Sequence, residues 1–202
     1  MTTTRTTKLP RGAIRIPVPN TYQQTDYTCG PAALRAVCEY FGVGPDTEHD
    51  FRADMGTPPT GADPGHLMQA MVKYGLEFRP FYPMTLRQLK QSVKQGRPVI
   101  LMLQAWGQGP DHKWRRSYRR MWRDGHWVVA IGYDAAGVYF EDPSIYNARG
   151  FIPYKELMER WHDWGANKEH MYFYGIAVWP SKHPRRTHRR KREQVSLVRL
   201  IQ

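Results

Sequence analysis

Long uninterrupted apolar runs are absent from this 202-residue sequence, and its mean hydropathy is −0.67. Both features argue against a membrane-spanning helix, which needs about 20 consecutive, mostly apolar residues. The first 12 residues are rich in Thr, with scattered Arg and Lys, and lack the apolar core of a secretory signal. From these absences we expect a soluble protein in the cytoplasm.

Cysteine is scarce, because the chain has only Cys29 and Cys38. Both fall in one predicted helix, where a separation of nine residues places them about 13 Å apart, too far for a disulfide bond. The scarcity of cysteine fits a reducing compartment. Neither the cysteines nor the eight histidines follow a zinc-binding spacing, so we expect no metal and no cofactor.

Positive charge is in excess, with a formal net charge of +12, but it is concentrated in two segments. The first covers residues 182–202 and the second residues 113–123, and the rest of the chain is close to neutral. We expect residues 181–202 to be a solvated basic tail. The alternative is electrostatic attachment to nucleic acid, an anionic membrane or an acidic protein. Base stacking is not expected, since no aromatic residue lies among the basic ones.

The segment 113–123 differs from the tail because aromatic residues recur in it every four positions, at Trp114, Tyr118 and Trp122. On a helix these rings would form one stripe beside a basic face. Packing of the stripe into the core is the simpler interpretation. The alternative is a lid that selects acidic substrates or substrates with a C-terminal carboxylate.

Chain length and composition predict one domain, which we place over residues 21–180, after a flexible lead of residues 1–20. Apolar residues at helical spacing, with Gly or Thr at the ends, predict helices at 30–41, 48–55, 64–74, 85–95 and 154–161. Alternating or continuous apolar runs predict strands at 76–82, 98–103, 125–133, 138–143, 150–153 and 170–179, with a short strand within 13–18.

Cys29 stands where a polar loop ends and the first predicted helix begins. The unpaired N–H groups and the dipole of a helix N-terminus favour an anion, and therefore a thiolate, at that position. Pro31 fits the first turn, and Gly30 leaves room beside the sulfur. We interpret Cys29 as a candidate nucleophile, and the alternative is a small buried cysteine that only starts a helix.

A cysteine nucleophile needs a base, and the base needs a group that orients it. His126 opens the strand predicted at 125–133, and Asp142 ends the strand predicted after the turn near residue 135. An antiparallel hairpin places position 126 opposite positions 142–144, within reach of a carboxylate–imidazole hydrogen bond. The alternative is a histidine and an aspartate that only cap backbone groups.

Acyl transfer also needs donors for the oxyanion. The Cys29 backbone N–H can supply one, and the side-chain amide of Gln23, six residues earlier, can supply another. Gln24 is the competing candidate for that second donor.

Three motifs follow one another in the sequence: Gln23-x5-Cys29-Gly-Pro-Ala-Ala-Leu, then Gly-His126-Trp-Val-Val-x-x-Gly-Tyr-Asp, then Glu-Asp142-Pro. Over residues 23–161 the chain resembles the peptidase C39-like cysteine peptidases of the papain-like superfamily. The resemblance implies a papain-like α+β fold, in which an N-terminal helix carrying the nucleophile packs on an antiparallel sheet. It also implies His126 as base, Asp142 as orienting acid, Gln23 in the oxyanion hole and a peptide or protein substrate.

The best-known branch of that family is fused to an export ATPase and cleaves leader peptides after a double glycine. Here Thr28, rather than an acid, precedes the cysteine, and no transmembrane or ATPase part is present, so the chain resembles the stand-alone group. Two rival functions stay open. One is an acyl or peptidyl transferase that uses the same site, and the other is a C39-like module that binds nucleic acid or another anionic partner without catalysis.

Overall fold

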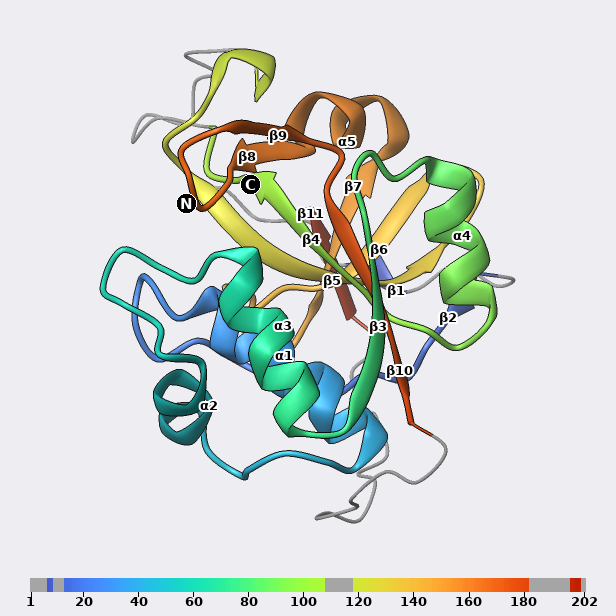
Figure 1. Cartoon of the computed structure of the whole chain (residues 1–202). Coiled ribbons are helices and arrows are strands. Elements are labelled where there is room, and N and C mark those ends of the chain that lie inside the picture. The colour runs from blue at the N-terminus through green and yellow to red at the C-terminus, as the bar shows by residue number, and fades with distance from the viewer. Residues whose placement is uncertain (1–6, 9–12, 108–117, 182–196, 201–202) are drawn as a thin grey trace.

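A nine-stranded sheet is the frame of the fold, and helices lie on both sides of it (Figure 1). The computed structural model describes residues 7–8, 13–107, 118–181 and 197–200. The helices are α1 (Cys29–Phe41), α2 (Glu48–Met55), α3 (Pro64–Lys73), α4 (Leu86–Lys94), α5 (Tyr154–Arg160) and the 3₁₀ turn η1 (Tyr118–Arg120). The strands are β1 (Thr7–Lys8), β2 (Ile14–Arg15), β3 (Leu76–Phe81), β4 (Val99–Gln104), β5 (Gly125–Tyr133), β6 (Gly137–Glu141), β7 (Arg149–Pro153), β8 (His162–Trp164), β9 (His170–Tyr172), β10 (Gly175–Pro180) and β11 (Leu197–Leu200).

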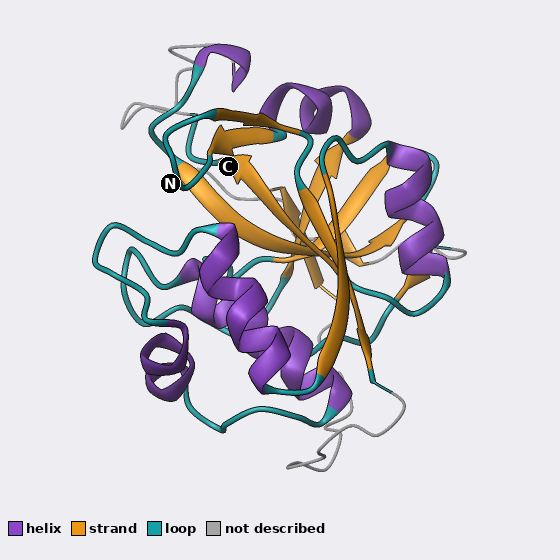
Figure 2. Cartoon of the chain, in the orientation of Figure 1, coloured by secondary structure: helices purple, strands orange, loops and turns teal. Residues whose placement is uncertain are grey.

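The main sheet has the strand order β1-β11-β7-β6-β5-β4-β10-β3, and β2 pairs with β5 away from this path. Its described pairings are antiparallel except for β11 with β7. Strands β8 and β9 form a separate two-stranded sheet. Figure 2 shows α1, α2 and α3 gathered on one side of the strands and α4 on the other. By this strand order, β5 lies in the middle of the sheet, and α1 packs against it.

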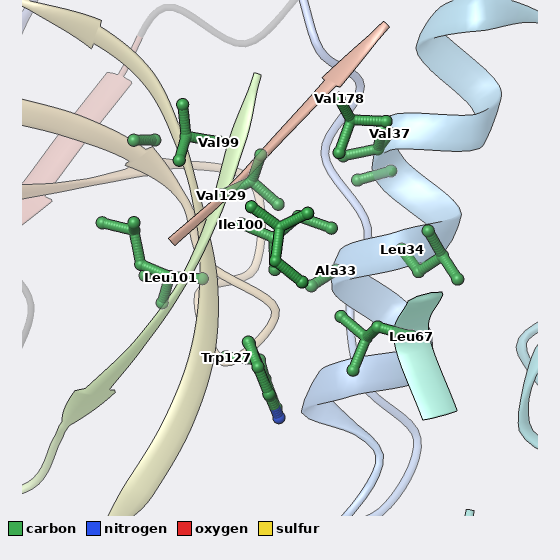
Figure 3. Close-up of a cluster of buried hydrophobic side chains, with 14 of the residues drawn as sticks. Ala33, Leu34, Val37, Leu67, Val99, Ile100, Leu101, Trp127, Val129 and Val178 are labelled. Atoms are coloured by element: carbon green, nitrogen blue, oxygen red, sulfur yellow. The ribbon is translucent and has the colours of Figure 1, made fainter. Parts of the chain in front are cut away.

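Helix α1 is nearly enclosed by the sheet and its neighbouring helices. Ten of its 13 residues are buried, and it ends at Gly42, whose left-handed φ of 72° lets its N–H reach the carbonyls of Cys38 and Glu39. Figure 3 shows Ala33 and Val37 of α1 facing Val129 of β5 and Val178 of β10. Burying a valine side chain contributes about 1.5–3 kcal/mol. The start of α1 is therefore held rigidly against the sheet.

The fold class and the helices predicted from the sequence are confirmed. The predicted caps are also present, since Thr85 opens α4 with a capping box and Gly42 closes α1. The strand predicted at 170–179 is wrong as one element, because Phe173 has a positive φ of 57° that separates β9 from β10. Cys29 and Cys38 are both free thiols, as expected.

Segments at both ends of the chain pair with the main sheet. At the N-terminal end, β2 pairs with β5 through Ile14 and Tyr133, and Ile16 and Val18 are buried in the core. Within the tail, Leu197–Leu200 pairs with β7 as β11. Residues 182–196 and residues 113–117 of the aromatic and basic segment lie outside the described residues. Among the helices that are described, none is long and apolar enough to cross a membrane.

Candidate active site

Cys29 is the first residue of α1, with 7% of its surface exposed. The preceding Thr28 occupies the N-cap position but makes no capping hydrogen bond. Its hydroxyl donates to the Thr25 carbonyl instead, and it accepts from the Thr25 backbone N–H. The first-turn N–H groups of α1 are therefore left without a side-chain cap beside the Cys29 sulfur, which favours an anion there.

Gly30 has a packing role that the sequence did not indicate. A Cβ at this position would lie 2.8 Å from the Cβ of Ala62 and 3.4 Å from Trp127 Cδ1. The indole N–H of Trp127 in turn donates to the Ala62 carbonyl at 2.8 Å. The missing side chain thus lets the loop before α3 close against α1 and β5.

His126 lies near the start of β5, where it pairs with Leu103 of β4 and is 1% exposed. Its Nε2 is 2.7 Å from Oδ1 of Asp142, and neither side chain has exposed surface. The ring of Trp106 packs against the imidazole, with ring centroids 4.9 Å apart. Since Nε2 is engaged by Asp142, Nδ1 is the ring nitrogen that remains available to another group.

The three groups are electrostatically coupled. Burial alone lowers the pKa of His126, but the charge and hydrogen bond of Asp142 and the nearby Cys29 side chain outweigh it and raise that pKa to about 10. Burial raises the pKa of Asp142, and the His126 charge, with hydrogen bonds from His126 and Ser144, outweighs this and lowers it. The pair is therefore an imidazolium and a carboxylate at neutral pH.

Asp142 directly follows β6 and is fixed by its own loop. The backbone N–H and the hydroxyl of Ser144 donate to its Oδ1 at 2.9 and 2.8 Å, and the N–H of Ile145 donates to its carbonyl at 2.9 Å. The hairpin of β5 and β6 carries a register shift between Ala130 and Gly132. The strand pairing ends at Glu141, so the carboxylate reaches His126 from the loop that follows.

Gln23 lies in the loop that leads into α1. Its backbone N–H donates to the carbonyl of Pro143 at 2.9 Å, which ties this loop to the residue after Asp142. Its side-chain Nε2 donates one hydrogen bond, to the Thr25 carbonyl at 2.7 Å. Gln24 is exposed, and its backbone N–H donates to Glu48 instead. Gln23 is thus partly buried, whereas the competing candidate Gln24 is exposed.

A buried ion pair anchors the same loop. Glu141 and Arg149 form a salt bridge with no exposed side-chain surface. Glu141 accepts hydrogen bonds from the backbone N–H of Thr21 at 2.6 Å and from Asn20 Nδ2. The Thr21 hydroxyl donates to the Ala32 carbonyl of α1 at 3.0 Å. These contacts fix the chain between β2 and α1.

A cleft of about 620 Å³ opens beside Cys29. The α1 side contributes Cys29, Tyr27 and the loop 58–63, and the opposite side contributes Trp106, residues 122–125 and residues 163–166. No group of three or more potential metal ligands occurs within the described ranges. A cleft of this size lies within the range of ligand-binding pockets.

The sequence did not single out two residues at this site, Trp106 and Asp163. The ring of Trp106 packs on His126, and the backbone of Trp106 has a positive φ of 49°. The only sequence signal for this residue was that it is a tryptophan in a Gly-rich connection. Asp163 lines the cleft from β8, a three-residue strand that the sequence pattern did not predict.

Comparison with known proteins relates both the sequence and the fold to one group. A sequence model of the Peptidase_C39 like family matches residues 15–169. A search of curated proteins found no match. Among solved structures, one described as a C39-like peptidase from Bacillus anthracis superimposes with a TM-score of 0.64 at 18% identity, covering 85% of this chain and 99% of that one.

Two further structures are similar. The peptidase domain of Streptococcus ComA, a bi-functional ABC transporter involved in quorum sensing, has a TM-score of 0.57 at 17% identity, covering 81% of this chain and 99% of that one. A double glycine motif protease from an AMS/PCAT transporter, in complex with its leader peptide, has a TM-score of 0.54 at 19% identity, covering 86% and 98%. At these identities the structural likeness shows the fold.

Proposed function

The chain belongs to the peptidase C39-like family, and we propose that it is a cysteine peptidase that hydrolyses peptide bonds through Cys29, His126 and Asp142. The observation that carries the proposal is the fully buried His126–Asp142 pair, 2.7 Å apart, together with the Cys29 side chain, which is near enough to help raise the pKa of His126. A buried imidazolium beside a thiol at a helix N-terminus stabilises the thiolate, which is the nucleophilic form.

In the first half of the reaction, the Cys29 thiolate attacks the carbonyl carbon of the substrate and the carbonyl oxygen becomes an oxyanion. The backbone N–H of Cys29 and the second hydrogen on Gln23 Nε2 are the donors that we assign to this oxyanion. When the tetrahedral intermediate collapses, the C–N bond breaks and Nδ1 of His126 gives its proton to the leaving amine. A thioester on Cys29 and a neutral imidazole remain.

In the second half, the neutral His126 takes a proton from water, and the hydroxide attacks the thioester carbon. The C–S bond breaks, the acid product leaves, and the thiolate–imidazolium pair is restored. Asp142 does not change its protonation in either half. It holds Nε2 of His126 and stabilises the imidazolium.

The substrate class we propose is a peptide or an unstructured protein segment. The cleft beside Cys29 has the volume for such a chain. One structural relative, the double glycine motif protease, is described in complex with a leader peptide, which supports a peptide as the ligand of this fold. The sequence and the cleft give no reason to assign double-glycine specificity to this chain.

The test is digestion of a proteome-derived peptide library by the 202-residue protein, with mass-spectrometric identification of the new termini. Wild type should generate new termini, and Cys29→Ala and His126→Ala should not. Cys38→Ala is the matched control, since Cys38 is a buried thiol on the same helix with no role in the proposed chemistry. New termini that persist in Cys29→Ala would refute the assignment.

A further inference from the structure

Asp163 is held in a fixed position beside the candidate base. It packs directly on Gly125, the residue before His126, because a Cβ at position 125 would lie 2.1 Å from its Oδ2. Gln104, which is fully buried, donates from Nε2 to Oδ1 of Asp163 at 3.0 Å and to the His162 carbonyl at 3.2 Å. Oε1 of the same amide accepts from the Asp124 N–H. The Asp163 carboxylate is therefore fixed in the wall of the cleft that Cys29 also lines.

This carboxylate has no basic partner among the residues that the structure describes. No Lys or Arg in the described part of the chain forms an ion pair with Asp163. Burial raises its pKa to about 6, against the opposing effects of hydrogen bonds from Trp164 and Gln104 and of the His126 charge. Burying a carboxylate without a cation is costly, and a ligand that supplies the cation recovers that cost.

The surroundings of Asp163 suit a cationic group. Trp106, Trp122 and Trp164 line the same cleft, and the face of an indole ring attracts ammonium and guanidinium groups. The cleft is also lined by Asp26, Asp63 and Asp124, against the exposed Arg123 and Lys168. Among the described residues that line the cleft, acidic side chains thus outnumber basic ones, although the net charge of the chain is +12.

We propose that Asp163 is a specificity-determining residue that binds the ammonium or guanidinium group of a Lys or Arg side chain next to the scissile bond of the substrate. The proposal rests on the proposed peptidase function, since Cys29 and Asp163 line one cleft. The proposed preference is for basic substrates, whereas the basic residues of 113–123 suggested a lid that selects acidic ones. A basic substrate residue would pair with the carboxylate while the Trp rings cover its aliphatic stem.

The first test needs no peptidase activity. Cys29 is modified with 2-aminoethyl, 2-sulfonatoethyl or methyl methanethiosulfonate, which are cationic, anionic and neutral, and adducts at Cys29 are quantified over time by peptide mapping. The neutral reagent corrects for changes in intrinsic reactivity. In wild type the cationic reagent should react at least tenfold faster than the anionic one, although the net charge of the chain favours the anion.

Two isosteric variants distinguish the effect of Asp163 from the effect of the other negative charges in the cleft. Asp163→Asn should bring the cation-to-anion rate ratio close to one, whereas Asp26→Asn, which removes an exposed carboxylate from the same cleft, should leave most of the preference. The proposal is overturned by an anion preference in wild type, by an equal effect of both variants, or by failure of all three reagents to reach Cys29.

The second test is the peptide-library digestion, now read for sequence preference. Wild-type cleavage sites should be enriched in Lys or Arg at one position beside the scissile bond, and Asp163→Asn should lose that enrichment. Cleavage with no such preference would overturn the role of Asp163 and leave the peptidase function intact. A cationic preference in the thiol assay with no cleavage of any peptide would refute the peptidase function and leave the cation-binding site standing.

Discussion

Nε2 of His126 lies 2.7 Å from Oδ1 of Asp142, and both side chains are fully enclosed by protein. The contact joins the start of β5 to the residue that follows β6. Because water does not screen a pair at this depth, the carboxylate both orients the imidazole and keeps it charged. The contact therefore fixes both the position and the charge of the candidate base.

Removal of the carboxylate should disable the base. We expect Asp142→Ala to lower kcat/KM by about 10³–10⁴, because the imidazole loses its orientation and its counter-charge. Asp142→Asn should lose less activity, since an amide oxygen can still accept a hydrogen bond from the Nε2–H group of His126. Steady-state cleavage of a peptide found in the library screen measures both. Asp134→Asn, in the turn between β5 and β6, should keep wild-type kcat/KM, and equal losses at the two positions would mean that hairpin damage explains the effect.

The ion pair should also appear in the pH dependence of stability. The pKa of His126 is raised to about 10 in the folded protein, above the ordinary value near 6.5, so its stabilising contribution is complete below about pH 6.5 and is lost as the pH rises through 10. We expect urea denaturation from pH 7 to pH 10 to show a loss of unfolding free energy that the double variant His126→Ala/Asp142→Ala lacks. Parallel curves for the two proteins would mean that the histidine is neutral in the folded state.

A variant of Gln23 should affect stabilisation of the oxyanion without affecting activation of the nucleophile. We expect Gln23→Ala to lower kcat by about 10²–10³. Alkylation of Cys29 by iodoacetamide should be unchanged, since displacement of iodide forms no oxyanion. Gln24→Ala is the matched control, because its side chain is exposed. Loss of alkylation in parallel with kcat would instead indicate that Gln23 only positions the loop before α1.

Asp163, which has no basic partner in the described part of the chain, should weaken the fold at pH values above its pKa. Because the pKa of Asp163 is raised to about 6, the folded state binds this proton more tightly than the unfolded chain, and stability falls as the pH rises from about 4 to above 6. Relative to pH 4, Asp163→Asn should therefore gain about 1–3 kcal/mol of unfolding free energy over wild type at pH 8. A difference that does not vary with pH would show that the carboxylate is well solvated.

Elements defined by neighbouring residues could be predicted from the sequence. The end of α1 at Gly42 and the start of α4 at Thr85 depend on one backbone angle and one capping box, both set within a few residues. The approach of Asp142 to His126 was also predictable, because a tight hairpin brings its two ends together. The register shift near Ala130 displaces the paired positions by one residue, and the Asp142 side chain still reaches His126.

Features that depend on distant contacts were missed. Strand β8 has only three residues and is defined by β9 and by packing against β4. Asp163 gains its place from Gln104, 59 residues earlier, and from the lack of a side chain at Gly125. The pairing of β11 with β7 likewise joins segments with no shared local pattern.

A solvated tail, attachment of residues 182–196 to an anionic partner and a cytoplasmic location stay predictions.

The central claim is that His126 activates Cys29, and the rate of Cys29 alkylation by iodoacetamide as a function of pH tests it most directly. Mass spectrometry of the native protein would follow Cys29 and Cys38 separately, in wild type and in His126→Ala. We predict rapid labelling of Cys29 alone near neutral pH, and a shift of that labelling to more alkaline pH in the variant. Equal labelling of the two cysteines, or a Cys29 profile unchanged by His126→Ala, would contradict the account.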